Sequence, residues 1–160
     1  MPISGSLKGK TRICTVVPST TAYTAGDNIG GKLTFTNIIT NDYGSILLKS
    51  ARLMDTSTAA YGSTLFLTGQ DLSTGTAFTD NSAFDPADTD LPKLEGVVPF
   101  STSNVQLLAN AQIYHANAVD QIINVNSSDR SIYGALVAVG TPTFACAQEA
   151  TIVIEFEELV

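Results

Sequence analysis

Short runs of alternating apolar and polar residues, separated by turn residues roughly every ten positions, constrain this chain more than any other feature. A period of two is that of a strand with one face in the core, whereas an amphipathic helix repeats its apolar residues every three or four positions. Lys32–Ile38 is the clearest example, because Leu33 and Phe35 alternate with polar residues. No alternation of strands with helices favours a parallel sheet. We therefore predict an all-β fold, an antiparallel β-sandwich or jelly roll.

The remaining apolar runs complete the predicted sheets. Ser45–Thr56 fits both a long strand with a bulge and an amphipathic helix, and the turn residues on both sides of it favour the strand. Ser131–Val139 is apolar on both faces, which predicts a central strand. Further strands are expected at Thr11–Val17, Tyr61–Thr68, Val97–Phe100, Val105–Tyr114, Val119–Val125 and Thr151–Val160.

One short helix is expected within Ser82–Gly96. Aspartates and Pro86 stand at the start of this segment, and Gly96 closes it after two leucines, which is the usual order of a helix cap and a helix stop. A chain of 160 residues has the length of one domain with a sizeable core. We therefore predict a flexible basic N-terminal arm at residues 1–10 and a single β-sandwich domain at residues 11–160.

Charge and hydropathy oppose several classes of partner. Fifteen Asp and Glu against eight Lys and Arg give a formal net charge of -7, which repels nucleic-acid phosphates and anionic lipids. No segment approaches the roughly eighteen apolar residues of a membrane-spanning helix, and no apolar run after Lys10 indicates a signal peptide. We expect a protein made in the cytoplasm, without nucleic-acid or membrane partners. Cys14 and Cys146 are then expected to be buried thiols.

The run Gly26–Gly31 has the glycines of a phosphate-binding loop, but it leads into a strand. A phosphate loop needs backbone N–H groups that lead into a helix, usually with a lysine on the phosphates. The structural interpretation is stronger: Asp27 and Asn28 stabilise a turn through side-chain hydrogen bonds, while Gly30 and Gly31 permit a positive φ or a bulge. We expect no nucleotide site here.

An acidic cluster at Asp80, Asp85, Asp88 and Asp90 is the candidate metal group. Calcium takes six to eight oxygen ligands, and carboxylates are among those it prefers. The spacing lacks the DxDxDG pattern of a calcium loop, and helix capping in a solvated loop explains the same residues. Asp85, Asp88 and Asp90 are therefore a calcium candidate that the spacing does not favour, and no other metal or cofactor is expected.

Catalytic residues are not expected. His115 is the single histidine, and although Asp120 is near it and serines are plentiful, no GxSxG segment marks a nucleophile. Two carboxylates for glycoside cleavage could be chosen among the acids, but such sites usually carry aromatic platforms and tryptophan is absent. A hydrolase would need a triad or a carboxylate pair in a pocket. We predict that the protein is not an enzyme.

Two groups of residues are candidates for contacts with other chains. Lys8, Lys10 and Arg12 begin the chain and three glutamates end it, so the basic end of one copy could meet the acidic end of its neighbour. The alternative is that both ends are solvated, because surface ion pairs contribute only about 0 to 1 kcal/mol. Phe78 and Phe84 are the two aromatic residues that the strand pattern does not assign to the core.

Five segments then stand in a recognisable order, namely Tyr23–Phe35, Ile46–Leu48 with Arg52–Asp55, Leu65–Leu67, Asp90–Phe100 and Ile132–Ala145. In this order they resemble a widespread family of small tailed-bacteriophage virion proteins, which are head-associated or decoration-type. The resemblance extends from Tyr23 to the C-terminus. It implies a location in the virion, a partnership with the major capsid protein or other virion proteins, and no catalytic residues.

The residues and the resemblance lead to the same expectation. A chain rich in hydroxyl and apolar side chains and poor in charge suits broad protein–protein contacts. We expect a non-enzymatic structural protein that attaches to a capsid shell and stabilises it, as a homo-oligomer for which capsid symmetry favours a trimer. The alternative is a carbohydrate-binding or adhesin-type sandwich that uses the loop Thr68–Asn81 and exposed aromatic residues.

Overall fold

The computed structural model describes residues 9–56, 60–72, 78–145 and 150–159. Most of these residues lie in antiparallel strands, and the only helical elements among them are two 3₁₀ turns of three residues each. The elements in chain order are β1 (Gly9–Val16), β2 (Asn28–Phe35), β3 (Gly44–Asp55), β4 (Ser63–Thr68), η1 (Leu91–Lys93), β5 (Leu94–Phe100), η2 (Thr102–Asn104), β6 (Val105–Leu107), β7 (Gln112–Ala116), β8 (Gln121–Val125), β9 (Ile132–Ala138) and β10 (Ala150–Leu159).

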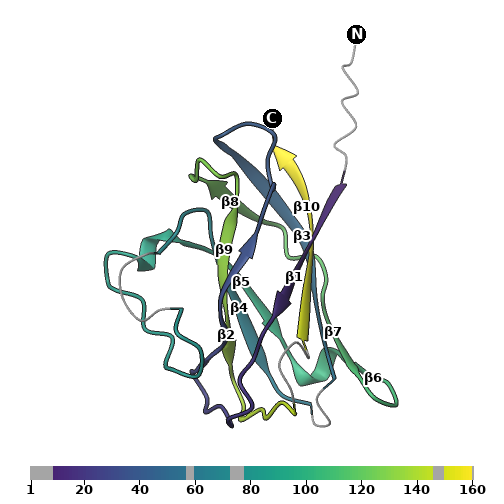
Figure 1. The fold of residues 1–160 in the computed structure, drawn as a ribbon. Helices are drawn as coiled ribbons and strands as arrows, with labels where there is room; N and C mark the ends of the chain where they lie inside the picture. The colour runs from purple at the N-terminus through teal and green to yellow at the C-terminus, as the bar shows by residue number, and fades with distance from the viewer. Residues whose placement is uncertain (1–8, 57–59, 73–77, 146–149, 160) are drawn as a thin grey trace.

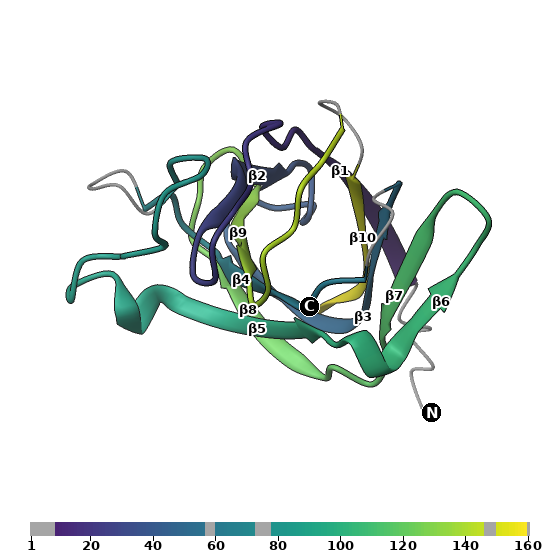
Figure 2. The same cartoon turned by 90° about the horizontal axis from the view of Figure 1, so that it is seen from below.

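The strands form two sheets that pack face to face as a β-sandwich (Figures 1 and 2). The six-stranded sheet has the order β1-β10-β3-β7-β6, and β8 pairs with the first half of β3 beside β7. The four-stranded sheet has the order β2-β9-β4-β5. The predicted all-β class and sandwich architecture are confirmed. No helix in the described part of the chain is long and apolar enough to cross a membrane.

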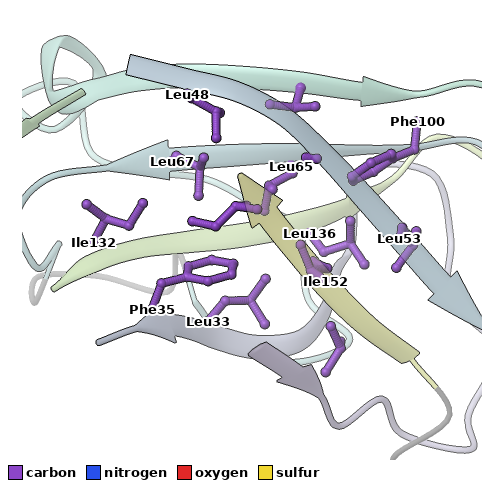
Figure 3. Packing of buried hydrophobic residues seen from close by; sticks show 14 of the residues in the cluster. Leu33, Phe35, Leu48, Leu53, Leu65, Leu67, Phe100, Ile132, Leu136 and Ile152 are labelled. Carbon is purple, nitrogen blue, oxygen red and sulfur yellow. The ribbon is translucent and has the colours of Figure 1, made fainter. Parts of the chain in front are cut away.

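The core lies between the two sheets and is built by the inward positions of the alternating strands. Figure 3 shows leucine and phenylalanine side chains of β2 and β4 meeting those of β3 and β10 across this space. Leu33, Leu65, Leu53 and Ile152 are each at most 1% exposed. Burial of this kind is the main favourable term in folding. The fully buried side chains come from both sheets, so the described strands share one core.

Two of the strand predictions are confirmed in detail. Every residue of β9 is buried, and β9 lies between β2 and β4, as the apolar pattern on both of its faces predicts. The segment that also fitted a helix is the long strand β3. Its register against β10 shifts between Glu155 and Phe156, which leaves Lys49 without a direct partner and produces the predicted bulge.

The predicted strand Val105–Tyr114 is instead a hairpin. Its first part is β6 and its second part is β7, and the Leu108 N–H bonds to the carbonyl of Ala111 at 2.8 Å across the turn. Asn110 lies in this turn, where asparagine is common because it adopts turn conformations readily. Apolar alternation continues through the turn in the sequence, which is why the pattern alone suggested one strand.

The predicted helix within Ser82–Gly96 is reduced to the 3₁₀ turn η1. Asp90 precedes this turn but its side chain makes no capping hydrogen bond, and it pairs instead with Lys93 at 2.6 Å. Gly96 does not stop a helix, because it is a buried residue of β5. A Cβ there would lie 2.9 Å from the Leu67 Cβ and 3.1 Å from the Ile123 Cδ1, so glycine allows β5 to approach its neighbours.

The glycine run near the start of β2 has the predicted structural role. The Asp27 carboxylate accepts hydrogen bonds from the N–H and hydroxyl of Thr24, at 2.7 and 2.8 Å, and so holds the turn. Gly30 and Gly31 have φ of +76° and +75°, and the pairing of β2 with β9 is irregular between Ile29 and Leu33. These two glycines therefore form a bulge inside β2, which begins at Asn28 rather than at Lys32.

Candidate functional site

The outer face of the four-stranded sheet is covered by the chain itself over β9, whereas outward residues at its two edges, such as Lys32 on β2 and Val97 on β5, are exposed. The cover consists of residues 69–72 and 78–93, which we call the covering segment, and it runs outside β2, β9 and β4 in Figure 2. Three residues of β9 point to this outer side, and they are only 0 to 9% exposed: Tyr133, Ala135 and Val137. The part of this face over β9 is therefore an internal surface of the folded chain.

Specific contacts attach the covering segment to the sheet. The Asp80 carboxylate accepts hydrogen bonds from the Tyr23 hydroxyl at 2.7 Å and from the Gly30 N–H at 2.6 Å. The ring of Phe84 stacks on that of Phe66 in β4, with 5.1 Å between centroids. Phe78 is half-buried in the same segment. The two predicted interface aromatics therefore lie in the covering segment, and Phe84 contacts its own sheet rather than standing free in solvent.

The outer face of the six-stranded sheet differs sharply. Among its outward-pointing residues on the described strands, only Val153 is buried, at 5% exposed. Ile13 on β1 lies opposite Val153 and is 65% exposed, and Ile122 on β8 is 55% exposed. We call this surface the open face, defined by the outward side chains Thr11, Ile13, Thr15, Leu47, Ser50, Arg52, Met54, Ile113, His115, Ile122, Thr151, Val153 and Glu155.

Five charged residues lie on or beside the open face, and four of them form two ion pairs, while the fifth is Glu157 on β10, opposite Leu47. Arg52 on β3 contacts Glu155 on β10 at 3.0 Å, and Glu155 also accepts a hydrogen bond from Ser50. Lys49, in the bulge of β3, pairs with Asp120 at 2.6 Å. Neutralisation of this kind leaves a surface of apolar and hydroxyl side chains with little net field, which suits contact with another protein.

The basic residues at the N-terminal end have partners within their own chain. Gly9 and Lys10, which were expected in the arm, belong to β1, because β1 pairs with β10 from Gly9 onward. Lys10 forms an ion pair with Glu158, and the Arg12 guanidinium donates to the carbonyl oxygens of Thr36 and Asn37 beyond the end of β2. The predicted pairing of basic and acidic ends therefore occurs inside one molecule. Lys8 lies outside the described residues.

The calcium candidate is not assembled. Within the described ranges, no group of three or more His, Cys, Asp or Glu residues is placed to hold a metal ion. Asp85 and Asp88 are exposed, whereas Asp90 is 1% exposed and its carboxylate pairs with Lys93. Asp80 is turned toward Tyr23 and Gly30. Asp80 and Asp90 therefore serve separate local contacts, and Asp85 and Asp88 lie in solvent.

His115 lies on the open face and has no arrangement for catalysis around it. Its register partner across the sheet is Arg52. The hollow beside it has a volume of about 520 Å³ and is lined, among the described residues, by His115, Asn104 and Asn117. Neither a serine nor a carboxylate lines this hollow, so the geometry of a nucleophile next to a base does not occur there.

The deepest polar cluster is structural in character. The Tyr114 hydroxyl accepts a hydrogen bond from the Tyr61 N–H at 2.9 Å and donates one to the Gln112 side chain at 2.9 Å. Burial, with the nearby Asp55 carboxylate, raises the pKa of Tyr61 far above its usual range. Burial also raises the pKa of Tyr114. Both phenols stay protonated at neutral pH, so neither acts as a base or a nucleophile.

A hollow of about 520 Å³ opens above this cluster at one end of the sandwich. Among the described residues its lining is uncharged: Ala60, Tyr61, Gly62, Thr102, Gly140, Thr141, Pro142 and Thr143. No aromatic ring offers a platform there, since Tyr61 is only 5% exposed. The hollow therefore lacks the stacking surface that a carbohydrate site would need.

The thiol prediction is met in part. Cys14 is half-buried on β1 and packs against the core, and burial raises the pKa of its thiol above the ordinary value. A raised pKa keeps the sulfur protonated and therefore unreactive at neutral pH. Cys146 lies outside the described residues.

Comparison with known proteins adds nothing to the functional argument. Neither the scan against protein-family models nor the search of curated proteins gives a match to this chain.

The exposed apolar residues are what sequence reasoning missed. Leu107 and Leu108, at the tip of the β6–β7 hairpin, are 66% and 50% exposed, and Ile122 was counted only as a strand residue. In the sequence they look like core positions, because the alternation that marks a strand does not say which strands lie at an edge. One signal was available: no Lys, Arg, Asp or Glu occurs between Glu95 and Asp120, the longest such run in the chain.

Proposed function

We propose that this chain is a non-enzymatic virion structural protein, which attaches to a bacteriophage capsid shell as a decoration or stabilising protein through protein–protein contacts. The observation that supports this most is the contrast between the two outer faces. One is covered over β9 by the chain's own segment, while the other exposes Ile13 and Ile122 on either side of the Arg52–Glu155 pair. A face that combines exposed apolar side chains with paired charges suits contact with another protein.

The chemistry of the site supports binding rather than reaction. The described residues hold no candidate metal group, His115 has no nucleophile beside it, and the buried phenols stay protonated. The resemblance to small tailed-phage virion proteins agrees with such a surface. The glycan-binding alternative gains no support, because the aromatic ring of Phe84 stacks on Phe66 and the hollow at Tyr61 has no exposed aromatic ring among its described lining residues.

The attachment surface we propose is the open face, not the residues first chosen from the sequence. Lys10 pairs with Glu158 of the neighbouring strand, Arg12 bonds to the segment after β2 in the other sheet, and Phe84 helps to attach the covering segment. Their loss would act through stability of the fold. Ile13 and Ile122 can be changed with little effect on folding, because they are 65% and 55% exposed.

The test is co-sedimentation with purified capsid shells that lack the protein. The double variant Ile13→Asp, Ile122→Asp should lose most of its shell binding, because two charges would enter the contact. Leu91→Asp is the matched control, since Leu91 is 51% exposed but lies in the covering segment, away from the open face. Equal shell binding by both variants would contradict the open face as the site, and no binding by the wild-type chain would contradict shell attachment itself.

A further inference from the structure

β8 is an edge strand too, but its Asn124 N–H donates to the Glu95 side chain. Of the other four sheet edges, three are closed by the chain itself. At β5, the Gln121 side chain accepts a hydrogen bond from the Val97 N–H at 2.8 Å and donates one to the Val97 carbonyl at 2.9 Å. At β2, the covering segment adds a bridge between Asp27 and Ala83. At β1, Lys10 and Arg12 occupy inward positions of the edge strand. Inward charges and covered edges are devices that prevent strand pairing between molecules.

The fourth edge, β6, has none of these devices. It pairs with β7 from Val105 to Leu107, and no other described strand lies beyond it. The hairpin stands out from the body of the sandwich in Figure 2. Gln106, Leu107 and Leu108 are all exposed, and no proline or charged residue interrupts the edge. An edge strand of this kind offers unpaired backbone N–H and C=O groups to another strand.

We propose that β6 is a self-association edge, at which two copies of this chain pair their β6 strands in antiparallel orientation about a twofold axis. The six-stranded sheets would then be continuous across the two copies. Because antiparallel pairing of identical strands is symmetric, the contact closes as a dimer and does not propagate into a filament. The inference stands on the hairpin geometry and does not depend on attachment to a shell.

Electrostatic repulsion between copies favours contact at the β6 edge over contact at other parts of the surface. Each copy carries a formal net charge of -7, so copies repel one another over most orientations. The hairpin lies in the longest stretch without charged residues, between Glu95 and Asp120. Contact there brings no like charges directly together, and it covers Leu107, which is 66% exposed in the single chain.

The register follows from the length of the strand. A symmetric pairing of a three-residue strand is centred on its middle residue, which is Gln106. Gln106 then faces its own counterpart, and Val105 of each copy faces Leu107 of the other on the inner side of the sheet. Directly opposite pairs of this kind contribute roughly 0.2 to 1 kcal/mol each. The contact is small, so we expect a dimer that dissociates on dilution.

Size-exclusion chromatography with light scattering, over a dilution series, tests the oligomeric state. The wild-type chain should shift from the mass of two chains toward that of one as it is diluted. Leu107→Glu should be monomeric at every concentration. Val139→Glu should dimerise like the wild type, because Val139 has a similar exposure of 61% and lies outside the β6–β7 hairpin and the open face. A wild-type monomer throughout, a trimer, or a dimer that Leu107→Glu leaves intact would overturn the proposal.

A crosslinking experiment tests the register and does not depend on whether Leu107→Glu folds stably. Opposite Cα atoms in an antiparallel pair lie about 4.5 to 5.5 Å apart, within the usual range for a disulfide. Gln106→Cys should therefore give a disulfide-linked dimer on mild oxidation. Thr11→Cys, on the exposed side of β1, is the control and should remain uncrosslinked, as should the wild type. Absence of the Gln106→Cys dimer, or equal crosslinking of both variants, would overturn the pairing.

Discussion

The two sheets of this sandwich differ in how much of their outer faces and edges the chain itself covers. The four-stranded sheet has its outer face covered over β9 by residues 69–72 and 78–93, and its β5 edge is closed by Gln121. The six-stranded sheet leaves its outer face open, and its β6 edge has no partner strand among the described residues. The chain has therefore used its long loop to stabilise one sheet. The open face and the β6 edge are the surfaces of the six-stranded sheet that the described chain leaves uncovered.

The largest expected effect concerns Gly69, where the covering segment leaves β4. A Cβ there would lie 1.6 Å from the Asn124 carbonyl oxygen, and the Gly69 carbonyl also accepts a hydrogen bond from Asn126 at 2.8 Å. Gly69→Ala would have to separate these backbones. We expect it to lower the free energy of unfolding by about 3 kcal/mol or more, measured by urea denaturation with circular dichroism.

Gly9→Ala is the control for this substitution. Nothing lies within 4 Å of a Cβ at Gly9, at the start of β1. We expect a change within about 0.5 kcal/mol. Equal urea midpoints for the two variants would show that the approach of β4 to β8 tolerates a methyl group, and the covered sheet would then be no more tightly built than the open one.

Phe66→Ala is expected to give the next largest effect. Phe66 supports the covering segment through its stacked contact with Phe84, and both rings are half-buried. Removal of a partly buried ring from this contact should cost about 2 kcal/mol. Ile122→Ala on the open face should change stability by less than about 0.5 kcal/mol. A loss at Ile122 as large as that at Phe66 would mean that the open face is also covered within the single chain.

Local patterns were enough to predict most of the strands. Ser131–Val139 was identified as central because both of its faces are apolar, and β9 is fully buried. The turn at Asp27 and the bulge at Gly30 and Gly31 followed from residue types with known backbone preferences. These features depend on neighbours in the sequence, and sequence periodicity reports such features directly.

The sequence alone could not predict which surfaces are covered and which are open. Phe84 was assigned to an interface because the segment around it shows no strand period, yet its partner is Phe66, on a different strand. Lys10 appeared free because its partner, Glu158, lies 148 positions away. Alternation shows that a strand has an apolar side, but pairing order decides which strands become edges and which faces receive a loop.

The closed edge of β5 allows a direct comparison with the open edge of β6. Gln121→Ala removes both hydrogen bonds to the Val97 peptide, which are 2.8 and 2.9 Å long, and we expect a loss of about 1 kcal/mol in unfolding free energy. Gln106→Ala, on the open edge, should be neutral when measured at low protein concentration. Gln121→Ala should also associate more readily on concentration, because a second edge is exposed. Unchanged stability and mass for Gln121→Ala would contradict its role as an edge closure.

The smallest expected effect is on the pH dependence of stability at two carboxylates. These are Asp129, which precedes β9, and Glu158 on β10. The hydrogen bond from Tyr133 at 2.5 Å lowers the pKa of Asp129. Burial acts to raise the pKa of Glu158, but hydrogen bonds from Lys10 and Thr40 outweigh it and lower that pKa. A carboxyl with a lowered folded-state pKa contributes stability above its ordinary pKa, and this contribution is lost as the pH falls through the folded-state value.

Asp129→Asn and Glu158→Gln should therefore each be less stable than the wild type at pH 7, by no more than about 1 kcal/mol. These differences in stability should close as the pH falls below the ordinary carboxyl pKa and through the lowered folded-state value. The salt dependence of stability distinguishes the two variants. Lys10 is charged, so the gap for Glu158→Gln should shrink in high salt. The phenol of Tyr133 is neutral, with its pKa raised to about 12 by burial and by Asp129, so the gap for Asp129→Asn should persist. Identical salt responses would mean that the ion pair at β1 contributes no more charge attraction than the neutral bond on the covered sheet.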